Sequence, residues 1–319
     1  MSEYSIRELE QWNERIERIA REAGLCCYEQ EFDIVCYEDM ISYEAYTGMP
    51  SHYPHWSYGK AYERLKTLNK YNLSGLPYEM VINSNPCIAY LMKDNTLPVQ
   101  ILTIAHVYGH NDFFRRNRLF EGSTRADYTI EMFKNHAGRI RDYIADPGIG
   151  YGRVEKILNA AHALKFQSPR TSIKRLSEDD TKKVLFDRLQ KPKSDHRLLE
   201  PNSTEEEMQL DFKRIPIEPE DDLLLFISNY GRLHDWERDI IDIVREETEY
   251  FLPQIDTKIM NEGWASFWHY SILNKLELPQ GFHIEFIKQH NQVIRPQEGR
   301  INPYYLGFKI FESISERYK

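Results

Sequence analysis

Two histidines one helical turn apart are the clearest candidate for a chemical site. His106 and His110 lie in the segment TIAHVYGHNDFFRRN, where apolar residues recur at steps of three and four. In a helix, side chains at positions i and i+4 project from the same face, so both rings can bind one metal ion. The alternative is a pair of core histidines whose ring nitrogens are satisfied by hydrogen bonds.

The segments before this helix favour the metal site. The runs YEMVINS and PCIAYLMK are apolar or alternating and are bounded by Asn, Pro and Asp, which predicts two strands joined by a hairpin-like turn. Asn95 or Thr96 can cap the helix that follows, and Pro98 suits its first turn. Two strands, a sharp turn and a helix carrying HxxGH is the order in which zincins present their metal-binding helix.

A third ligand is required, because a catalytic zinc site takes three protein ligands and leaves a fourth position open. Glu262 is the best candidate, and it lies in NEGWASFWHY on a second predicted helix. The run EGWA resembles the second-helix motif of a glutamate-type zincin branch, in which Glu binds the metal and Gly lets the helices approach closely. The alternative is an exposed Glu, but Met260, Trp264 and Phe267 predict a packed helix, where an unpaired carboxylate is costly.

The position that supplies the general base in HExxH enzymes carries no carboxylate here. In those enzymes the Glu after the first His activates the water, whereas this chain has Val107. A protease mechanism of the usual kind is therefore not supported. The candidates for a substitute base are Glu247, His269 and Glu155.

Further histidines and carboxylates lie on apolar helical faces. His269 follows Glu262 by seven residues, two turns along the same face, so we expect it to point into the same cavity as a metal ligand or base. His162 shares a polar stripe with Glu155 and is a further candidate ligand, and Glu247 lies within an apolar stripe. Each can also be an ordinary buried hydrogen-bonding residue. Together they resemble a carboxylate and histidine site between helices that can hold one or two ions, with zinc expected and iron or manganese as alternatives.

The chain divides into three parts by composition. Residues 1–166 are expected to form the N-terminal part of the core, and residues 220–319 its C-terminal helical part. Residues 167–219 are polar, charged and rich in acidic clusters, which predicts a mobile insertion. The expected fold is α+β and mainly helical, with a zincin-like core in which a small antiparallel sheet packs on the HxxGH helix.

Bulk composition excludes several classes of protein. The formal charge is −9, from 41 basic and 50 acidic residues, and no block of Lys and Arg is present, which disfavours nucleic acid and anionic membrane surfaces as partners. No apolar run approaches the roughly 20 residues that a membrane helix needs, and the charged start is unlike a signal peptide. Four cysteines without CxxC spacing argue against a disulfide framework. We therefore expect a cytoplasmic protein.

Five motifs spread over nearly the whole chain carry a specific family resemblance: MPSHYPHWSYGKAYERL, LPYEMVINSNPCIAYLM, TIAHVYGHNDFFRRN, NEGWASFWHY and NPYYLGFKIF. Together they are similar to the stage V sporulation protein R (SpoVR) family. Members of that family usually continue into a further C-terminal region, so the resemblance implies that this chain is truncated. Tyr304 or Tyr305 of the last motif can donate to an oxyanion only if the C-terminal segment folds over the site.

The resemblance implies a process rather than a reaction. The family is associated with formation of the spore cortex peptidoglycan, and relatives are often encoded beside a serine protein kinase, which makes such a kinase or a sporulation protein an expected partner. The first functional hypothesis is a metal-dependent hydrolase of an amide-containing, cell-wall-related substrate. The alternatives are a non-catalytic regulatory or scaffold metalloprotein and a dinuclear oxidative site.

Overall fold

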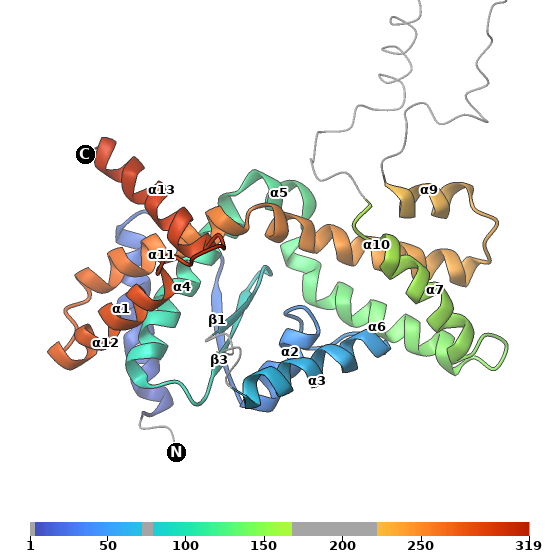
Figure 1. Ribbon diagram of the computed structural model, residues 1–319, viewed down its shortest axis with the longest axis horizontal. Helices are drawn as coiled ribbons and strands as arrows, with labels where there is room; N and C mark the ends of the chain where they lie inside the picture. The colour runs from blue at the N-terminus through green and yellow to red at the C-terminus, as the bar shows by residue number, and fades with distance from the viewer. Residues whose placement is uncertain (1–3, 72–78, 168–221, 319) are drawn as a thin grey trace, which may run out of the picture.

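A computed structural model describes residues 4–71, 79–167 and 222–318 of the chain. These residues form a mainly helical fold around one small sheet, as expected from the sequence (Figure 1). The predicted insertion at residues 167–219 lies, apart from Gln167, outside the described residues. Within the described part, no helix combines the length and the apolar composition that a membrane-spanning segment requires.

The sheet has three strands in the order β1-β3-β2. Strands β2 (Glu79–Ile82) and β3 (Cys87–Met92) form the predicted antiparallel pair, but β1 (Gln30–Val35) runs parallel to β3. The sheet is therefore mixed, and the prediction of a purely antiparallel sheet was wrong. Strand β1 escaped notice because it is an edge strand whose charged residues Glu31 and Asp33 are exposed, which hides the apolar alternation of a half-buried strand.

Helix α4 (Leu97–Arg116), which carries HxxGH, lies at the centre of one half of the molecule. Thr96 occupies the N-cap position and Pro98 the first turn, as predicted, but the Thr96 hydroxyl donates to Glu285 instead of capping the helix. Every residue from Leu97 to Phe114 except Pro98 is buried, because the sheet and other helices cover the helix on all sides. The helices packed against it are α1 (Ile6–Glu22), α11 (Lys258–Lys275) and α12 (Gln280–Val293).

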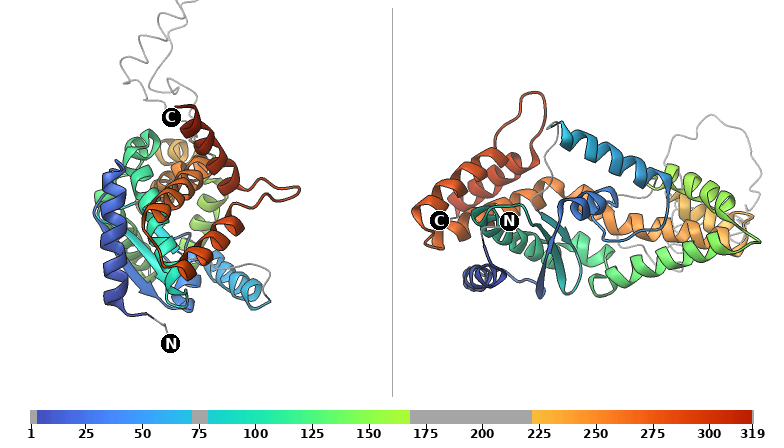
Figure 2. Two further views of the ribbon diagram at one scale, coloured as in Figure 1. Left: turned by 90° about the vertical axis from the view of Figure 1, so that its left-hand side faces the viewer. Right: turned by 90° about the horizontal axis from the view of Figure 1, so that it is seen from below.

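The other half of the molecule is a helical layer built on α10 (Asp235–Asp256). Helices α6 (Thr129–Ala145), α7 (Tyr151–Leu164) and α9 (Leu223–Tyr230) surround a second apolar core with it, at the opposite end from α1 and α12 (Figures 1 and 2). Helices α10 and α11 follow one another in the chain and connect the two halves. Between β3 and α7 the chain also forms α5 (Arg118–Ser123) and the short 3-10 helix η1 (Ala126–Tyr128), which leads into α6.

Three remaining helices complete the described structure. Helices α2 (Tyr37–Ala45) and α3 (Trp56–Lys70) follow strand β1, and the loop between them brings His52 and Tyr53 into the interior. Helix α13 (Pro303–Arg317) packs on α11. The C-terminal segment therefore folds back towards α4 and α11, the condition under which its tyrosines can approach the candidate site.

Candidate metal centre

Small residues bring three helices into close contact where the candidate ligands lie. A Cβ atom on Gly109 of α4 would lie 2.6 Å from the Cα atom of Ala265 in α11. A Cβ atom on Gly263 would lie 2.3 Å from the Cα atom of Gly307 in α13. Only glycine permits such approaches, since carbon atoms in contact normally stay about 3.5–4.0 Å apart. The expected close approach of helices at EGWA is present, with Gly109 and Ala265 joining α4 to α11 and Gly263 joining α11 to α13.

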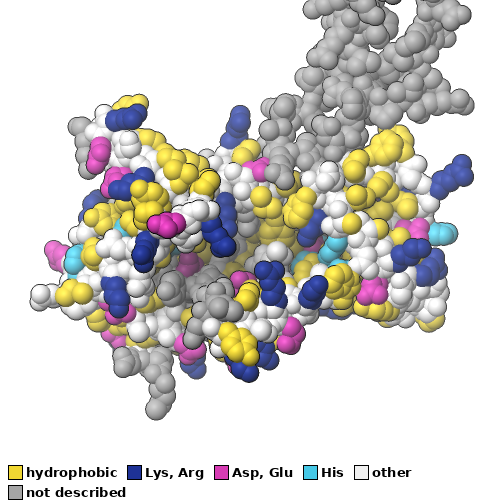
Figure 3. Space-filling view, viewed as in Figure 1, with side chains coloured by type: hydrophobic (Ala, Val, Ile, Leu, Met, Phe, Trp, Pro, Cys, Tyr) yellow, Lys and Arg dark blue, Asp and Glu magenta, His cyan; other side chains and the backbone are white. Residues whose placement is uncertain are grey.

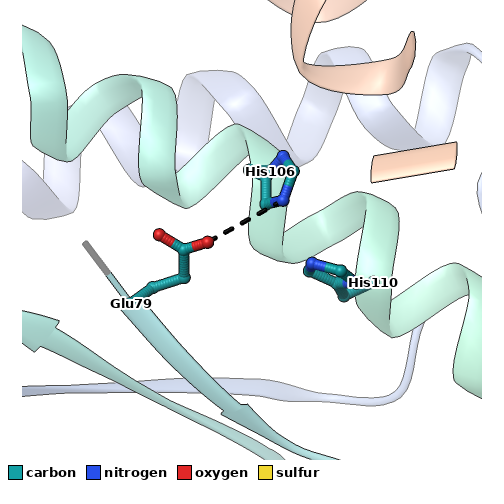
Figure 4. Close-up of side chains that lie close together, drawn as sticks. All are labelled: Glu79, His106 and His110. Carbon is teal, nitrogen blue, oxygen red and sulfur yellow. Dashed lines mark ion pairs between the residues drawn. The ribbon is translucent and has the colours of Figure 1, made fainter. Parts of the chain in front are cut away.

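Four side chains from these helices and the sheet converge on one space. The Nε2 atom of His110 lies 3.6 Å from Oε2 of Glu262, and Nε2 of His106 lies 3.9 Å from the same oxygen. On the side of the sheet, Nε2 of His106 lies 3.8 Å from Oε1 of Glu79 (Figure 4). These separations are too long for hydrogen bonds, so the donor atoms face a common gap without bonding to one another.

The spacing of these donors suits a divalent metal ion. Ligand atoms of Glu79, His106 and His110 all lie within 4.8 Å of one another. Two ligands at zinc bond lengths of about 2.0–2.2 Å in tetrahedral geometry lie roughly 3.3–3.6 Å apart, close to the shortest separation between Glu262 and a histidine. Imidazole and carboxylate ligands also suit iron and manganese. Among the described residues no second group of three such donors is found.

Glu79 is the member of this cluster that the sequence did not reveal. It is the first residue of β2, a strand that packs against α4, and the only available signal was one carboxylate in the apolar run YEMVI. Burial raises the pKa of Glu79 and the nearby charge of Glu262 raises it further, while His106 opposes both effects. The side chain is still 18% exposed, so a small molecule can reach the carboxylate.

His269 lies behind His106 rather than in the cluster. Its Nδ1 atom is 2.9 Å from Nδ1 of His106, and its Nε2 atom is 2.7 Å from Nδ1 of His290. Both ring nitrogens are therefore occupied, and the prediction of His269 as a metal ligand or base is not supported by this geometry. Seven residues advance a helix by about 10 Å. At that position the ring of His269 reaches Nδ1 of His106, on the side of the ring away from the Nε2 atom that faces Glu262.

The hydrogen-bonded row of His106, His269 and His290 determines which ring nitrogen of His106 can bind a metal ion. Burial lowers the pKa of His269 well below its usual value and lowers that of His290 to about 4, so both rings are neutral near pH 7 and each carries one hydrogen. When Nδ1 of His106 donates to His269 and Nε2 of His269 donates to His290, the lone pair of His106 Nε2 points into the cluster. Such outer hydrogen bonds orient the ring of a metal ligand.

His110 and Glu262 are held in the protonation states that metal binding requires. Burial, with help from His106, lowers the pKa of His110 to about 4, and its Nδ1 atom donates to Oδ1 of Asn261 at 2.9 Å. Burial alone would raise the pKa of Glu262, but His106, His110 and the Tyr304 hydroxyl hold it below the usual value. A neutral imidazole and an ionised carboxylate are the ligand forms of these groups.

A tyrosine hydroxyl and a buried apolar side chain lie beside the candidate ligands, from Tyr304 and Val107 respectively. The ring of Tyr304 stacks on that of His106, with centroids 6.3 Å apart, and its hydroxyl interacts with Glu262. Burial and the charges of Glu262 and Glu79 raise the pKa of Tyr304, so the hydroxyl remains a hydrogen-bond donor. Val107 is completely buried, so no carboxylate can approach the cluster from the residue after His106.

Glu247 belongs to a separate buried network. Its Oε2 atom lies 2.9 Å from Nε2 of His52, and its Oε1 atom lies 3.3 Å from Nδ1 of His136. Nδ1 of His52 accepts a hydrogen bond from the backbone N–H of Tyr53, so its Nε2 atom carries the hydrogen that is donated to Glu247. Both carboxylate oxygens are thus occupied. Glu247 is therefore a structural carboxylate of this network, contrary to its predicted role as the base.

His162 and Glu155 also lie outside the metal cluster. Nε2 of His162 is 2.7 Å from the hydroxyl of Tyr53, and burial lowers the pKa of His162 to about 3. Glu155 accepts a hydrogen bond from the Tyr151 hydroxyl at the surface of α7. The predicted polar stripe is present on α7, but α7 packs on α10 and not on α4. These residues are therefore neither ligand nor base for the cluster.

The network around His136 predicts a pH-dependent stability. Burial would lower the pKa of His136, but Glu246 and Glu247, which face its two ring nitrogens, raise it overall. Burial would raise the pKa of Glu247, but His136 and His52 lower it overall. The stabilisation that these ion pairs give the folded state is complete at pH values between the unfolded-state pKa values, about 4.3 for Glu and 6.5 for His. It is lost as pH falls through the lowered pKa of Glu247 or rises through the raised pKa of His136.

His136→Gln should therefore lower the free energy of unfolding by about 2 kcal/mol near pH 6, the usual size for a hydrogen bond to a charged group. The loss should shrink towards pH 9, as the wild-type imidazole loses its proton on passing through its raised pKa. Urea unfolding at pH 6 and pH 9 measures the change in the free energy of unfolding. The control is His283→Gln, which removes a histidine without a described ion pair. An equal loss at both pH values would show that His136 is not charged in the folded protein.

Comparison with known proteins agrees with the motif pattern. Residues 3–319 match the family described as SpoVR like protein. The chain is 38% identical over 319 residues to the uncharacterized protein YcgB of Escherichia coli (strain K12), an alignment that covers 94% of this chain and 62% of that protein. The chain thus spans less than two thirds of the length of this relative. No solved structure matches. The match over nearly all residues shows that the chain belongs to the SpoVR family.

Proposed function

We propose that this protein is a metal-dependent hydrolase of amide bonds. The observation that carries the proposal is the convergence of His106, His110, Glu262 and Glu79 on one space, with their donor atoms separated by 3.6–3.9 Å along the measured pairs. Two histidines and one glutamate are a ligand set of catalytic zinc sites that leave one position open. Zinc is the proposed ion, and iron or manganese is the alternative.

Glu79 is the proposed general base. It reaches the cluster from strand β2 and so replaces the carboxylate that is missing at Val107. Its raised pKa contrasts with the lowered pKa of Glu262, and carboxylates whose pKa values are pushed apart in one site commonly divide the roles of proton acceptor and charged ligand. Glu79 would accept the proton of the attacking water and pass it to the leaving amine.

Two neutral donors can stabilise the reacting carbonyl. A divalent ion in the cluster would polarise that carbonyl and lower the pKa of water. The Tyr304 hydroxyl remains protonated beside Glu262, and Asn261, whose Oδ1 atom accepts from His110, has its NH₂ group left to donate. Preorganised donors of this kind stabilise the negative charge that develops on the carbonyl oxygen.

The proposed setting follows from the family. Because the SpoVR name is linked to sporulation, we propose an amide-containing substrate related to the cell wall, as in formation of the spore cortex peptidoglycan. A serine protein kinase or a sporulation protein is the proposed partner. A second bound ion, as in a dinuclear oxidative centre, has no support among the described residues, since they contain one group of suitable donors.

Two experiments test the proposed function. The first is elemental analysis of protein purified without added metal, and the second is a hydrolysis assay on an unselective peptide library. We expect about one divalent ion per chain, hydrolysis that stops when a chelator removes it, and recovery when zinc is restored. A protein without bound metal, or hydrolysis that is unchanged by the chelator, would contradict the proposal.

A non-catalytic metalloprotein is the second candidate, and the apolar Val107 favours it. In that case the ion would stabilise the contact between α4 and α11 and no base would be needed. Stoichiometric metal in a protein that hydrolyses no member of the library would support this alternative.

A further inference from the structure

A cavity of about 340 Å³ extends from the metal cluster along helix α10. The view of Figure 3 shows a hollow in the middle of the molecule, with hydrophobic side chains in its floor and Lys or Arg side chains at its edge. One face of α10 forms a wall of the cavity through Val244, Glu247, Thr248, Phe251, Gln254 and Ile255. At 1.5 Å per residue this wall is roughly 16 Å long, which suits an elongated ligand.

The two ends of the cavity differ in chemistry. Asn261 and Glu262 of the metal centre line one end. At the other end, the loop before α3 contributes His52, and the end of α7 contributes His162 and Lys165. The charge of Glu247 acts on the ammonium group of Lys165. An extended molecule in this cavity would therefore have one part beside the metal cluster and another beside Lys165.

Two lysines and two glutamates line the cavity, but the described ion pairs do not join them to one another. Both oxygens of Glu247 are taken by His52 and His136, and Glu262 faces the histidines of the metal cluster. By contrast, Lys165 makes no ion pair with any described residue, and the same holds for Lys258.

Lys165 is the stronger candidate for binding an anionic ligand, because it is half-buried whereas Lys258 is exposed. Its ammonium group lies over the ring of Phe166, with 5.1 Å between Nζ and the ring centroid. Glu247 acts on this ammonium group only at a distance, and no described carboxylate forms an ion pair with it. Withdrawing a charge from water without a direct partner is unfavourable, and an anionic ligand would compensate this cost.

We propose that the cavity binds an acidic peptide, with a carboxylate of the peptide on Lys165 and a backbone amide beside Asn261 and Glu262. The choice of a peptide rests on the proposed amide hydrolysis and specifies its substrate class. The anion site itself rests on the cavity and on a lysine that forms no ion pair within the described part of the chain. The apolar wall around Phe251 would contact the side chains between the two ends.

Isothermal titration of the full, metal-loaded chain tests the proposal with two probes, acetyl-Ala-Ala-Glu with free carboxylates and the neutral acetyl-Ala-Ala-Gln amide. We expect the acidic peptide to bind at least about tenfold more tightly, the usual size of one charge-assisted hydrogen bond. Lys165→Met should remove this preference. Lys156→Met, which removes an exposed lysine from the same helix, should keep it.

The outcomes separate the anion site from the metal chemistry. Equal affinity of the wild type for the two peptides, or an undiminished preference in Lys165→Met, overturns the proposal. A preference that persists in metal-free His106→Ala and disappears in Lys165→Met supports the anion site even if the protein proves not to be a hydrolase.

Discussion

Replacing His106 with alanine is expected to remove the metal ion and the stabilisation that the ion provides. His106 contributes the Nε2 atom that faces both Glu79 and Glu262, so its loss leaves one histidine and two like-charged carboxylates in the cluster. A ligand that binds only the folded state stabilises it by about 4 kcal/mol when its free concentration is ~1,000 times the dissociation constant. Elemental analysis and urea unfolding with and without added metal measure the two effects.

Glu262→Ala should give the same result, because Glu262 faces both histidines from α11. His283→Ala, on α12, is the matched control and should keep both the metal and the metal-dependent part of the stability. The helical circular dichroism of both site variants should stay near that of the wild type, since broad apolar cores surround the helices. Retention of stoichiometric metal by both variants would show that the ligand assignment is wrong.

Replacing Glu79 with glutamine is expected to abolish hydrolysis while the metal remains bound. Glutamine has the same shape as glutamate but cannot accept a proton, so general-base catalysis is lost, which typically lowers kcat by about 10²–10⁴-fold. His106, His110 and Glu262 remain as ligands, so the metal content should still be about one ion per chain. Peptide hydrolysis and elemental analysis on the same preparation test both statements.

The control for this variant is Glu31→Gln, which neutralises an exposed carboxylate on strand β1 of the same sheet. It should change neither activity nor metal content. If Glu79→Gln loses its metal, Glu79 is a ligand and the base lies elsewhere. If Glu79→Gln keeps full activity, the carboxylate has no part in the reaction.

Local sequence patterns predicted the elements that hold the ligands. The apolar recurrence at three and four residues identified α4 and α11, and two short runs bounded by turn residues identified β2 and β3. These patterns can be recognised because each element turns apolar residues to the interior at the period of its backbone, 3.6 residues in a helix and two in a strand. Strand β1 lies at the edge of the sheet with exposed charges, so its period was obscured.

The sequence alone determined that His106 and His110 share a helical face, since a spacing of four residues is a property of the α-helix itself. The approach of Glu262 to them could be anticipated only through the EGWA resemblance. The tertiary structure decided everything that depends on the distance between elements. It brought Glu79 into the cluster from a strand, and it placed His269 behind His106, because the packing of separate elements is not encoded in the spacing of any one of them.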